Sequence, residues 1–194
     1  MKTSKRNELR IIGGLWRSRK IFFPDVEGLR PTPDRVRETL FNWLKAEIVG
    51  AHCLDLFSGS GALSFEALSR GAGKAVLVEE DKDAFECIQQ SAATLQAKKL
   101  EMHQQDCLVF LKNEQRNSSP FDIIFVDPPY AKKLLPTCFK LIDIHHWLKQ
   151  SGLIYFESET PITEQDLPNT WKILKAKRAG NVYYHLVQKQ ETVV

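Results

Sequence analysis

Phe121-Asp-Ile-Ile-Phe-Val-Asp-Pro-Pro-Tyr130 is the stretch that decides the fold. Five of its first six residues are apolar, which predicts a short strand buried on both faces. The two prolines end the strand, because proline cannot donate a hydrogen bond to a sheet. The loop then presents the Asp127 carboxylate, backbone carbonyls without a sheet partner and the Tyr130 ring. These groups suit a flat ligand with an amino group, such as a nucleobase. A plain Asp-Pro turn after a core strand is the structural alternative.

The chain on either side of this strand alternates between short apolar strands and amphipathic helices. We expect strands at 53–57, 75–79, 100–103 and 152–157, and helices at 62–70, 81–95, 106–113 and 134–149. Two closing strands at 171–177 and 182–188 are expected to pair antiparallel. This order predicts an α/β fold with a doubly wound, mostly parallel, seven-stranded sheet. Ligands bind such sheets at the carboxyl ends of the strands.

Composition is typical of one globular domain. The chain has 194 residues, of which 43% are hydrophobic and 26% charged. It has no apolar run of about 18 residues and no signal-peptide pattern, so we expect a cytoplasmic protein without a membrane partner. The four cysteines are far apart and no histidine stands at ligand spacing from them, so no metal site is expected. We predict a basic N-terminal extension at 1–30 and a main domain at 31–194.

Positive charge is concentrated at the N-terminus. Residues 1–37 carry ten basic and four acidic side chains, whereas the remaining 157 residues carry 17 and 20. Such an asymmetry favours a polyanionic partner, because lysine and arginine neutralise phosphates. The stretch 10–23 predicts a β-hairpin that turns at Gly13-Gly14, with Arg17 and Arg19 on one face. A solvated basic tail remains the alternative for the first residues.

A helix is expected directly after this extension. Thr32 stands at its N-cap and Pro33 at its first position. Arg35 and Arg37 lie off the apolar stripe of this helix, so we expect both to project outward. The side chains predicted to hold phosphates are therefore Arg10, Arg17, Arg19, Lys20, Arg35 and Arg37.

A second chemical stretch, Asp55-Leu-Phe-Ser-Gly-Ser-Gly61, joins the first parallel strand to a helix. Glycines there let the backbone approach a ligand, beside the free N–H groups of the helix start. A dinucleotide loop would have a glycine where Ser64 stands, and Asp55 suits a cationic ligand better than a phosphate. Glu79 ends the next strand, where a carboxylate can bind both hydroxyls of a ribose. Asp106 is either a helix cap or an acceptor for an adenine amine.

Taken together, these motifs resemble those of the bacterial S-adenosylmethionine-dependent methyltransferases that modify a guanine N2 amine in 16S rRNA. Beyond the glycine loop and Asp-Pro-Pro-Tyr, the resemblance covers Arg10-Ile-Ile-Gly-Gly-Leu-Trp-Arg-Ser-Arg-Lys20, Leu29-Arg-Pro-Thr-Pro-Asp-Arg-Val-Arg-Glu-Thr-Leu-Phe-Asn-Trp-Leu44 and Gly61-Ala-Leu-Ser-Phe-Glu-Ala-Leu-Ser-Arg-Gly71. Two positions depart from the pattern: Ser18 replaces a glycine, and Ser58 replaces an alanine.

The resemblance implies a class I, Rossmann-like methyltransferase that needs no metal and releases S-adenosylhomocysteine. It implies that the amine is held and the base stacked by Asp127, Pro128, Pro129 and Tyr130. It also implies that the cofactor is bound by Asp55, Phe57, Ser58, Gly59, Gly61, Glu79, Asp106 and Cys107. The expected partner is 16S rRNA or the small ribosomal subunit, and the expected state is a monomer.

Three other functions are compatible with parts of the sequence. A DNA adenine-N6 methyltransferase shares both motifs, but no stretch is left for a target-recognition domain. A module that binds RNA without turnover would keep the basic N-terminus. A nicotinamide oxidoreductase is disfavoured by Ser64 in the glycine loop.

Overall fold

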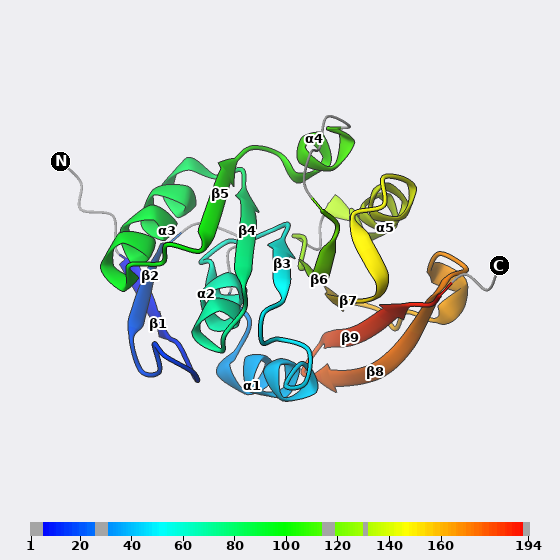
Figure 1. Ribbon diagram of the computed structural model, residues 1–194, viewed down its shortest axis with the longest axis horizontal. Coiled ribbons are helices and arrows are strands. Elements are labelled where there is room, and N and C mark those ends of the chain that lie inside the picture. The colour runs from blue at the N-terminus through cyan, green and yellow to red at the C-terminus, as the bar shows by residue number, and fades with distance from the viewer. Residues whose placement is uncertain (1–5, 26–30, 114–118, 130–131, 192–194) are drawn as a thin grey trace.

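The computed structural model describes residues 6–25, 31–113, 119–129 and 132–191 (Figure 1). Its helices are α1 (Asp34–Trp43), α2 (Ala62–Ser69), α3 (Lys82–Leu95), α4 (Cys107–Lys112), α5 (Leu135–Ile144) and the short 3-10 helix η2 (Glu164–Asp166). Its strands are β1 (Arg6–Arg10), β2 (Lys20–Pro24), β3 (His52–Asp55), β4 (Lys74–Glu79), β5 (Leu100–Gln104), β6 (Phe121–Val126), β7 (Leu148–Ser158), β8 (Trp171–Ala179) and β9 (Val182–Lys189). No helix within these ranges is long and apolar enough to cross a membrane.

A seven-stranded sheet with the order β5-β4-β3-β6-β7-β9-β8 forms the centre of the molecule. Neighbouring strands from β5 to β7 run parallel, and β9 and β8 complete the sheet antiparallel. The expected doubly wound, mostly parallel sheet is thus confirmed. The strand order reverses between β3 and β6, and ligands of such sheets bind at the carboxyl ends of the strands at this point.

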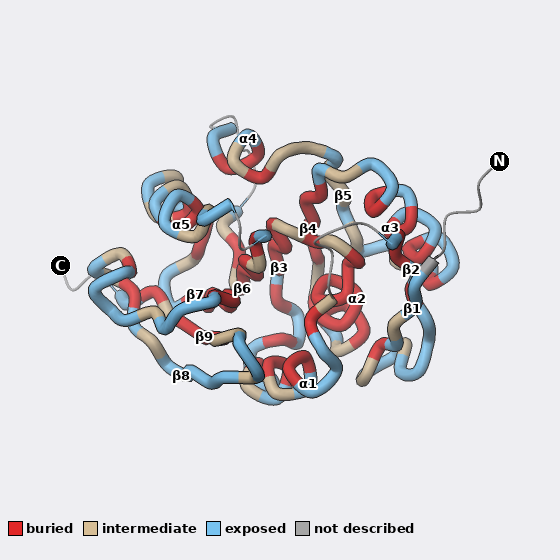
Figure 2. The backbone as a smooth tube through the Cα atoms, turned by 180° about the vertical axis from the view of Figure 1, so that it is seen from behind, coloured by how far each residue is buried: buried red, intermediate tan, exposed pale blue. Residues whose placement is uncertain are grey.

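The central strands are buried because helices cover both faces of the sheet (Figures 1 and 2). Ile124 and Val126 of β6 point toward the core under α4 and α5, whereas Ile123 and Phe125 point toward the core under α1 and α2. These four side chains are fully buried. The apolar run that predicts a strand buried on both faces is therefore confirmed as one. Burial of each such side chain stabilises the fold by about 1.5–3 kcal/mol.

The helix boundaries agree only in part with those predicted from the sequence. Asp81 and Asp106 each accept a hydrogen bond from a backbone N–H of the first turn, as expected of N-cap aspartates. The prediction of Thr32 as an N-cap is wrong, because Pro33 occupies that position and α1 begins at Asp34. The predicted helix 134–149 is too long, because α5 ends at Ile144 and β7 begins four residues later.

The N-terminal hairpin forms a two-stranded sheet of its own, but it does not turn at Gly13-Gly14. Arg10 pairs with Lys20, so residues 11–19 form a loop. This loop approaches the end of α2 so closely that a Cβ atom on Gly14, which has φ +76°, would lie 1.8 Å from the Ser69 carbonyl oxygen. The predicted hairpin is confirmed, whereas its tight turn is replaced by a loop that packs against the main domain.

Candidate active site

The carboxyl ends of β3 and β6 bring the two predicted chemical stretches together. Beyond the last paired residue of β3, the Leu56 N–H still donates to the Phe125 carbonyl of β6. The chain then turns through Gly59 and Gly61, which have φ +53° and +73°. A Cβ atom on Gly61 would lie 2.9 Å from the Phe65 ring, so both backbone conformation and space require glycine there. The glycine loop and the Asp127-Pro128 segment therefore follow neighbouring strands at the reversal of strand order, and we call the site formed there the crevice.

Asp55 is a buried carboxylate at the base of this loop. It is 3% exposed, and Ser64 Oγ of α2 donates a hydrogen bond of 2.8 Å to its Oδ2. Burial raises the pKa of Asp55 to about 7, against the opposing effect of the Ser64 hydrogen bond. Ser58 is also buried, and its hydroxyl donates to the Asp55 backbone carbonyl. A buried carboxylate whose pKa is raised in this way suits a cationic group that would restore its ionised form.

Glu79 holds the glycine loop at the end of β4. Its Oε2 accepts the Gly59 N–H at 2.6 Å and its Oε1 accepts the Asp81 N–H at 2.8 Å. Burial raises the pKa of Glu79, while these two hydrogen bonds oppose the rise. Each carboxylate oxygen has more than one acceptor site, so Glu79 retains acceptor capacity for hydroxyl groups in the crevice.

Asp106 and its neighbours stand beyond β5. Asp106 Oδ1 accepts the Val109 N–H at 2.9 Å and so caps α4, while its side chain stays partly exposed. Cys107 is buried at the first position of α4, and Phe57 packs partly buried against the same core. The cap interpretation of Asp106 is confirmed, and its second carboxylate oxygen is left for another donor.

Asp127 follows β6 directly and is partly exposed, with Pro128 buried and Pro129 exposed behind it. Burial and then the negative charges of Glu157 and Asp55 raise the pKa of Asp127 well above its usual range. Glu157 stands beside it on β7, because the register pairs Val126 with Phe156. Tyr130 lies outside the described residues.

Glu157 at the end of β7 is not among the site residues predicted from the sequence, where a solvent-exposed acid is an equally good interpretation. It is 4% exposed, and Tyr155 Oη donates to its Oε1 at 2.7 Å. The sequence signal that could have placed Glu157 near Asp127 is its position one residue past the apolar run of β7. Asp127 and Glu157 thus form a pair of neighbouring carboxylates, the acid pair, at the carboxyl ends of β6 and β7, where the negative charge of Glu157 increases the proton affinity of Asp127.

The predicted phosphate-binding residues do not gather at this crevice. Arg17, Arg19 and Lys20 are exposed, but Arg19 Nη2 donates to the Thr94 carbonyl in the last turn of α3. Because α3 begins next to the crevice and runs away from it, Thr94 lies roughly 18 Å farther along the helix. Arg10 and Arg35 are exposed as well.

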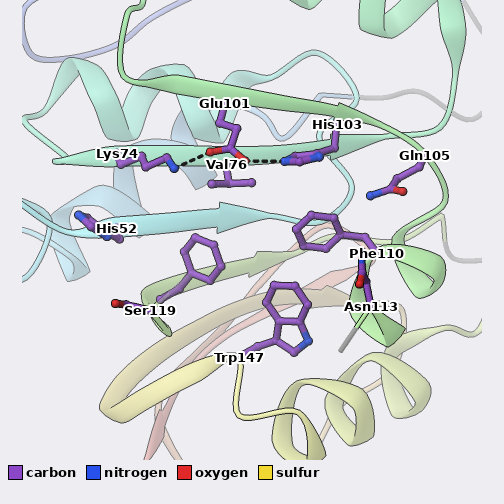
Figure 3. A pocket seen from close by; sticks show the side chains of 11 residues that line it. His52, Lys74, Val76, Glu101, His103, Gln105, Phe110, Asn113, Ser119 and Trp147 are labelled. Carbon is purple, nitrogen blue, oxygen red and sulfur yellow. Dashed lines mark hydrogen bonds and ion pairs between the residues drawn. The ribbon is translucent and has the colours of Figure 1, made fainter. Parts of the chain in front are cut away.

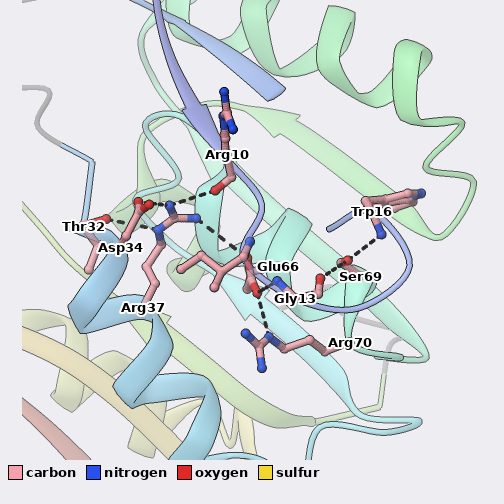
Figure 4. Close-up of polar contacts among 10 residues, drawn as sticks. Arg10, Gly13, Trp16, Thr32, Asp34, Arg37, Glu66, Ser69 and Arg70 are labelled. Carbon is pink, nitrogen blue, oxygen red and sulfur yellow. Dashed lines mark hydrogen bonds and ion pairs between the residues drawn. The ribbon is translucent and has the colours of Figure 1, made fainter. Parts of the chain in front are cut away.

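The prediction that Arg37 projects outward is wrong. Its side chain is fully buried and bonds to Asp34 Oδ1 at 2.6 Å and to the carbonyls of Arg10 and Thr32 (Figure 4). Its Nη1 lies 3.8 Å from Oε2 of buried Glu66. A charged side chain off the apolar stripe is thus turned inward by a counter-charge from another helix, which local sequence does not reveal.

Glu66 of α2 holds the loop of the N-terminal hairpin. Its carboxylate accepts the backbone N–H groups of Ile12 and Gly13 at 2.8 and 2.9 Å and the Arg70 Nε at 2.7 Å (Figure 4). Next to it, the Ser69 hydroxyl donates to the Gly13 carbonyl and accepts the Trp16 N–H. The sequence gives no signal for this role of Glu66, because Ile12 and Gly13 are far away in the sequence.

A cavity of about 330 Å³ lies apart from the crevice, beside the strands β4 and β5 (Figure 3). Lys74 and His103, which both contact the Glu101 carboxylate, form one wall with it, and Phe110 and Trp147 lie opposite. None of the predicted site residues lines it. No group of three or more metal-ligating side chains is found within the described part of the chain.

Fold and site together define a class I methyltransferase: a sheet of this strand order with a glycine loop and Asp-Pro-Pro at adjacent carboxyl ends. Residues 9–188 match the family model described as Conserved hypothetical protein 95, and the chain belongs to this family. It is 44% identical to the ribosomal RNA small subunit methyltransferase D of Escherichia coli K12, over 96% of this chain and 93% of that protein. The protein of the same name from Haemophilus influenzae is also 44% identical, over 94% and 95% of the two chains.

Solved structures give the same result. An Escherichia coli protein superposes with a TM-score of 0.84 at 44% identity and covers 96% of this chain and 100% of its own. A Haemophilus influenzae protein superposes with a TM-score of 0.80 at 41% identity, over 95% and 100% of the two chains. A more distant structure, complexed with S-adenosylhomocysteine, has a TM-score of 0.69 at 17% identity over 87% of this chain and 53% of its own, which shows the fold alone.

Proposed function

We propose that this protein transfers a methyl group from S-adenosylmethionine to the exocyclic N2 amine of a guanine in 16S rRNA. The observation that carries the proposal is the adjacency of the glycine loop and Asp127-Pro128 at the reversal of strand order. The relatives named as small subunit rRNA methyltransferases support the substrate class over DNA.

The crevice fits the cofactor residue by residue. Asp55 and the Gly59–Gly61 backbone would hold its amino-acid end, because a buried carboxylate and a helix start accept an ammonium and a carboxylate, respectively. Glu79 would accept the ribose hydroxyls, and Asp106 with the Cys107 backbone would hold the adenine. When bound, the cofactor supplies an electrophilic methyl group on a sulfonium.

Asp127 and Pro128 orient the nucleophile. A guanine amine is a poor nucleophile because its lone pair is delocalised into the ring. Hydrogen bonds from its two hydrogens to the Asp127 carboxylate and the Pro128 carbonyl favour a pyramidal nitrogen with a localised lone pair. Tyr130 stacks on the base, a contribution of roughly 1–3 kcal/mol.

The acid pair then accepts a proton. Formation of the N–C bond leaves the nitrogen with one proton too many and a positive charge, while the electron pair of the broken S–C bond stays on sulfur. Asp127 takes this proton, because burial and the Glu157 charge raise its pKa and so make it a stronger base. Tyr155 keeps Glu157 in place through its hydroxyl.

The test compares Asp127→Ala with the wild type on small subunits from a strain that lacks the gene. We expect Asp127→Ala to bind S-adenosylmethionine in calorimetry but to transfer no methyl group, and the wild type to yield N2-methylguanosine after digestion of the rRNA. Asp122→Asn, at the opposite end of the same strand, is the matched control and should remain active. A wild-type product other than N2-methylguanosine, or near-normal turnover by Asp127→Ala, would refute the assignment.

A further inference from the structure

The β8 edge of the sheet lies on the far side of the crevice from the N-terminal hairpin (Figures 1 and 2) and is rich in basic residues. The segment 171–189, which includes β8 and β9, contains five basic residues and no acidic residue. Lys175, Lys177 and Arg178 of β8 are exposed. None of the three takes part in an ion pair within the described part of the chain. Their charge is therefore available to a partner.

Strand register places the end of this edge level with the catalytic acids. Lys177 pairs with Tyr184 of β9, and Tyr184 pairs with Glu157 of β7. Asp127 stands in the same cross-strand row, one residue beyond Val126 and its partner Phe156. Three strand spacings of about 4.8 Å separate β6 from β8, so the Lys177 backbone lies on the order of 14 Å from that of Asp127.

A β-bulge turns the lysines toward one face of the sheet. Ile173 pairs with Val187, but Lys175 pairs with the adjacent Leu186, so Leu174 is an extra residue. Before the bulge, Ile173 packs on the α4 and α5 face; after it, Lys175 and Lys177 share the α1 face with Leu186 and Tyr184.

Aromatic rings accompany these cations. Lys177 Nζ lies 5.9 Å from the Trp43 ring centroid, and the Trp43 ring stacks on Tyr184 at 5.4 Å. On the other face, the Arg178 guanidinium lies 5.1 Å from the Tyr183 ring and donates to the Gly180 carbonyl. Cations interleaved with aromatic rings are a common feature of surfaces that bind single-stranded nucleic acid.

We propose that Lys177 and Arg178, with Lys175 beside them, bind phosphates of the RNA strand that flanks the target guanine. The inference rests on the proposed function, since it takes RNA as the partner, and it assigns the contact nearest the target base to β8. The predicted residues Arg17, Arg19 and Lys20 belong to the N-terminal hairpin and its loop, where Arg19 contacts the last turn of α3, and we assign them to RNA farther from the target base. Lysines on an edge strand also deter edge-to-edge pairing, which is the competing explanation.

The test measures the binding of a short RNA with one central guanine as a function of salt. Each lost phosphate contact lowers the slope of log K against log salt by about 0.7 for single strands. We expect Lys177→Gln to lower the slope by one contact and Lys177→Gln with Arg178→Gln by two, with a several-fold weaker affinity. Lys172→Gln is the matched control, because Lys172 is exposed on the same strand roughly 17 Å from Lys177.

Several results would overturn the proposal: an unchanged slope in both variants, an equal change in Lys172→Gln, or wild-type affinity that does not respond to salt. Self-association of the double variant with an unchanged slope would assign these residues to protection of the sheet edge instead. Thermal unfolding verifies that Lys177→Gln, which loses no hydrogen bond to the backbone, stays folded. Because the assay measures RNA affinity and not methyl transfer, its failure is distinct from failure of the proposed reaction.

Discussion

Replacing Glu66 by alanine should loosen the N-terminal extension and destabilise the whole protein. The change leaves the buried Arg37 guanidinium without its buried counter-charge and removes the acceptor of the Ile12 and Gly13 N–H groups. Removal of one partner of a buried ion pair costs about 3–5 kcal/mol. Arg37 keeps Asp34 at 2.6 Å, which favours the lower half of this range, and the two half-buried N–H groups add the cost of lost hydrogen bonds.

The expected loss of about 4 kcal/mol lowers the melting temperature of a chain of this size by on the order of 10 °C. Urea unfolding measures the loss of free energy directly, and trypsin tests the location, because Arg17 and Arg19 lie in the loop that Glu66 holds. Glu101→Ala is the control: its ion pair with Lys74 is largely exposed and should cost less than about 1 kcal/mol. A similar small loss for Glu66→Ala, with no faster cleavage in the loop, would refute the role of Glu66 as the link between the two parts.

Three further predictions concern the crevice. Glu157→Gln removes a negative charge beside Asp127 and so lowers its pKa; the acid limb of the kcat/KM profile should move to lower pH, and an unmoved limb would contradict the acid pair. Without cofactor, Asp55 binds more protons in the native than in the unfolded state between pH 4 and about 7, so urea unfolding should show stability falling as pH rises through that window. Asp55→Asn should abolish this contribution. Gly61→Ala should cost more stability than Gly50→Ala, since both have positive φ but only Gly61 faces Phe65 at 2.9 Å; equal losses in urea unfolding would show that the ring moves aside freely.

The central sheet could be predicted from sequence because the apolar residues of each strand themselves indicate that the strand is buried. The β6 run from Phe121 to Val126 is apolar on both faces, and the prolines after Asp127 mark its end. The glycines at 59 and 61 are likewise local signals, because their positive φ values require this residue type. Positions at the ends of successive parallel strands then meet at one edge, so the order of motifs was sufficient to group them.

Features that depend on distant partners could not be predicted. Arg37 follows the helical pattern of an exposed cation, and its burial depends on Glu66 of another helix and on the Arg10 carbonyl, both distant in the sequence. The pair Gly13-Gly14 indicates a tight turn, yet the loop instead follows the surface of α2, where Ser69 and Glu66 satisfy its backbone. The closeness of Glu157 to Asp127 could be recognised only after the register of β6 and β7 was known.

The extra residue in β8, Leu174, reverses the face of the sheet to which the following side chains point. If Leu174 were instead paired with Leu186 in an unbroken ladder, every side chain from Lys175 to the turn would exchange sides. Lys177 would then leave Trp43 and point to the α5 side, although the sequence would be the same. A related chain with one residue fewer at this point would keep the present faces without a bulge.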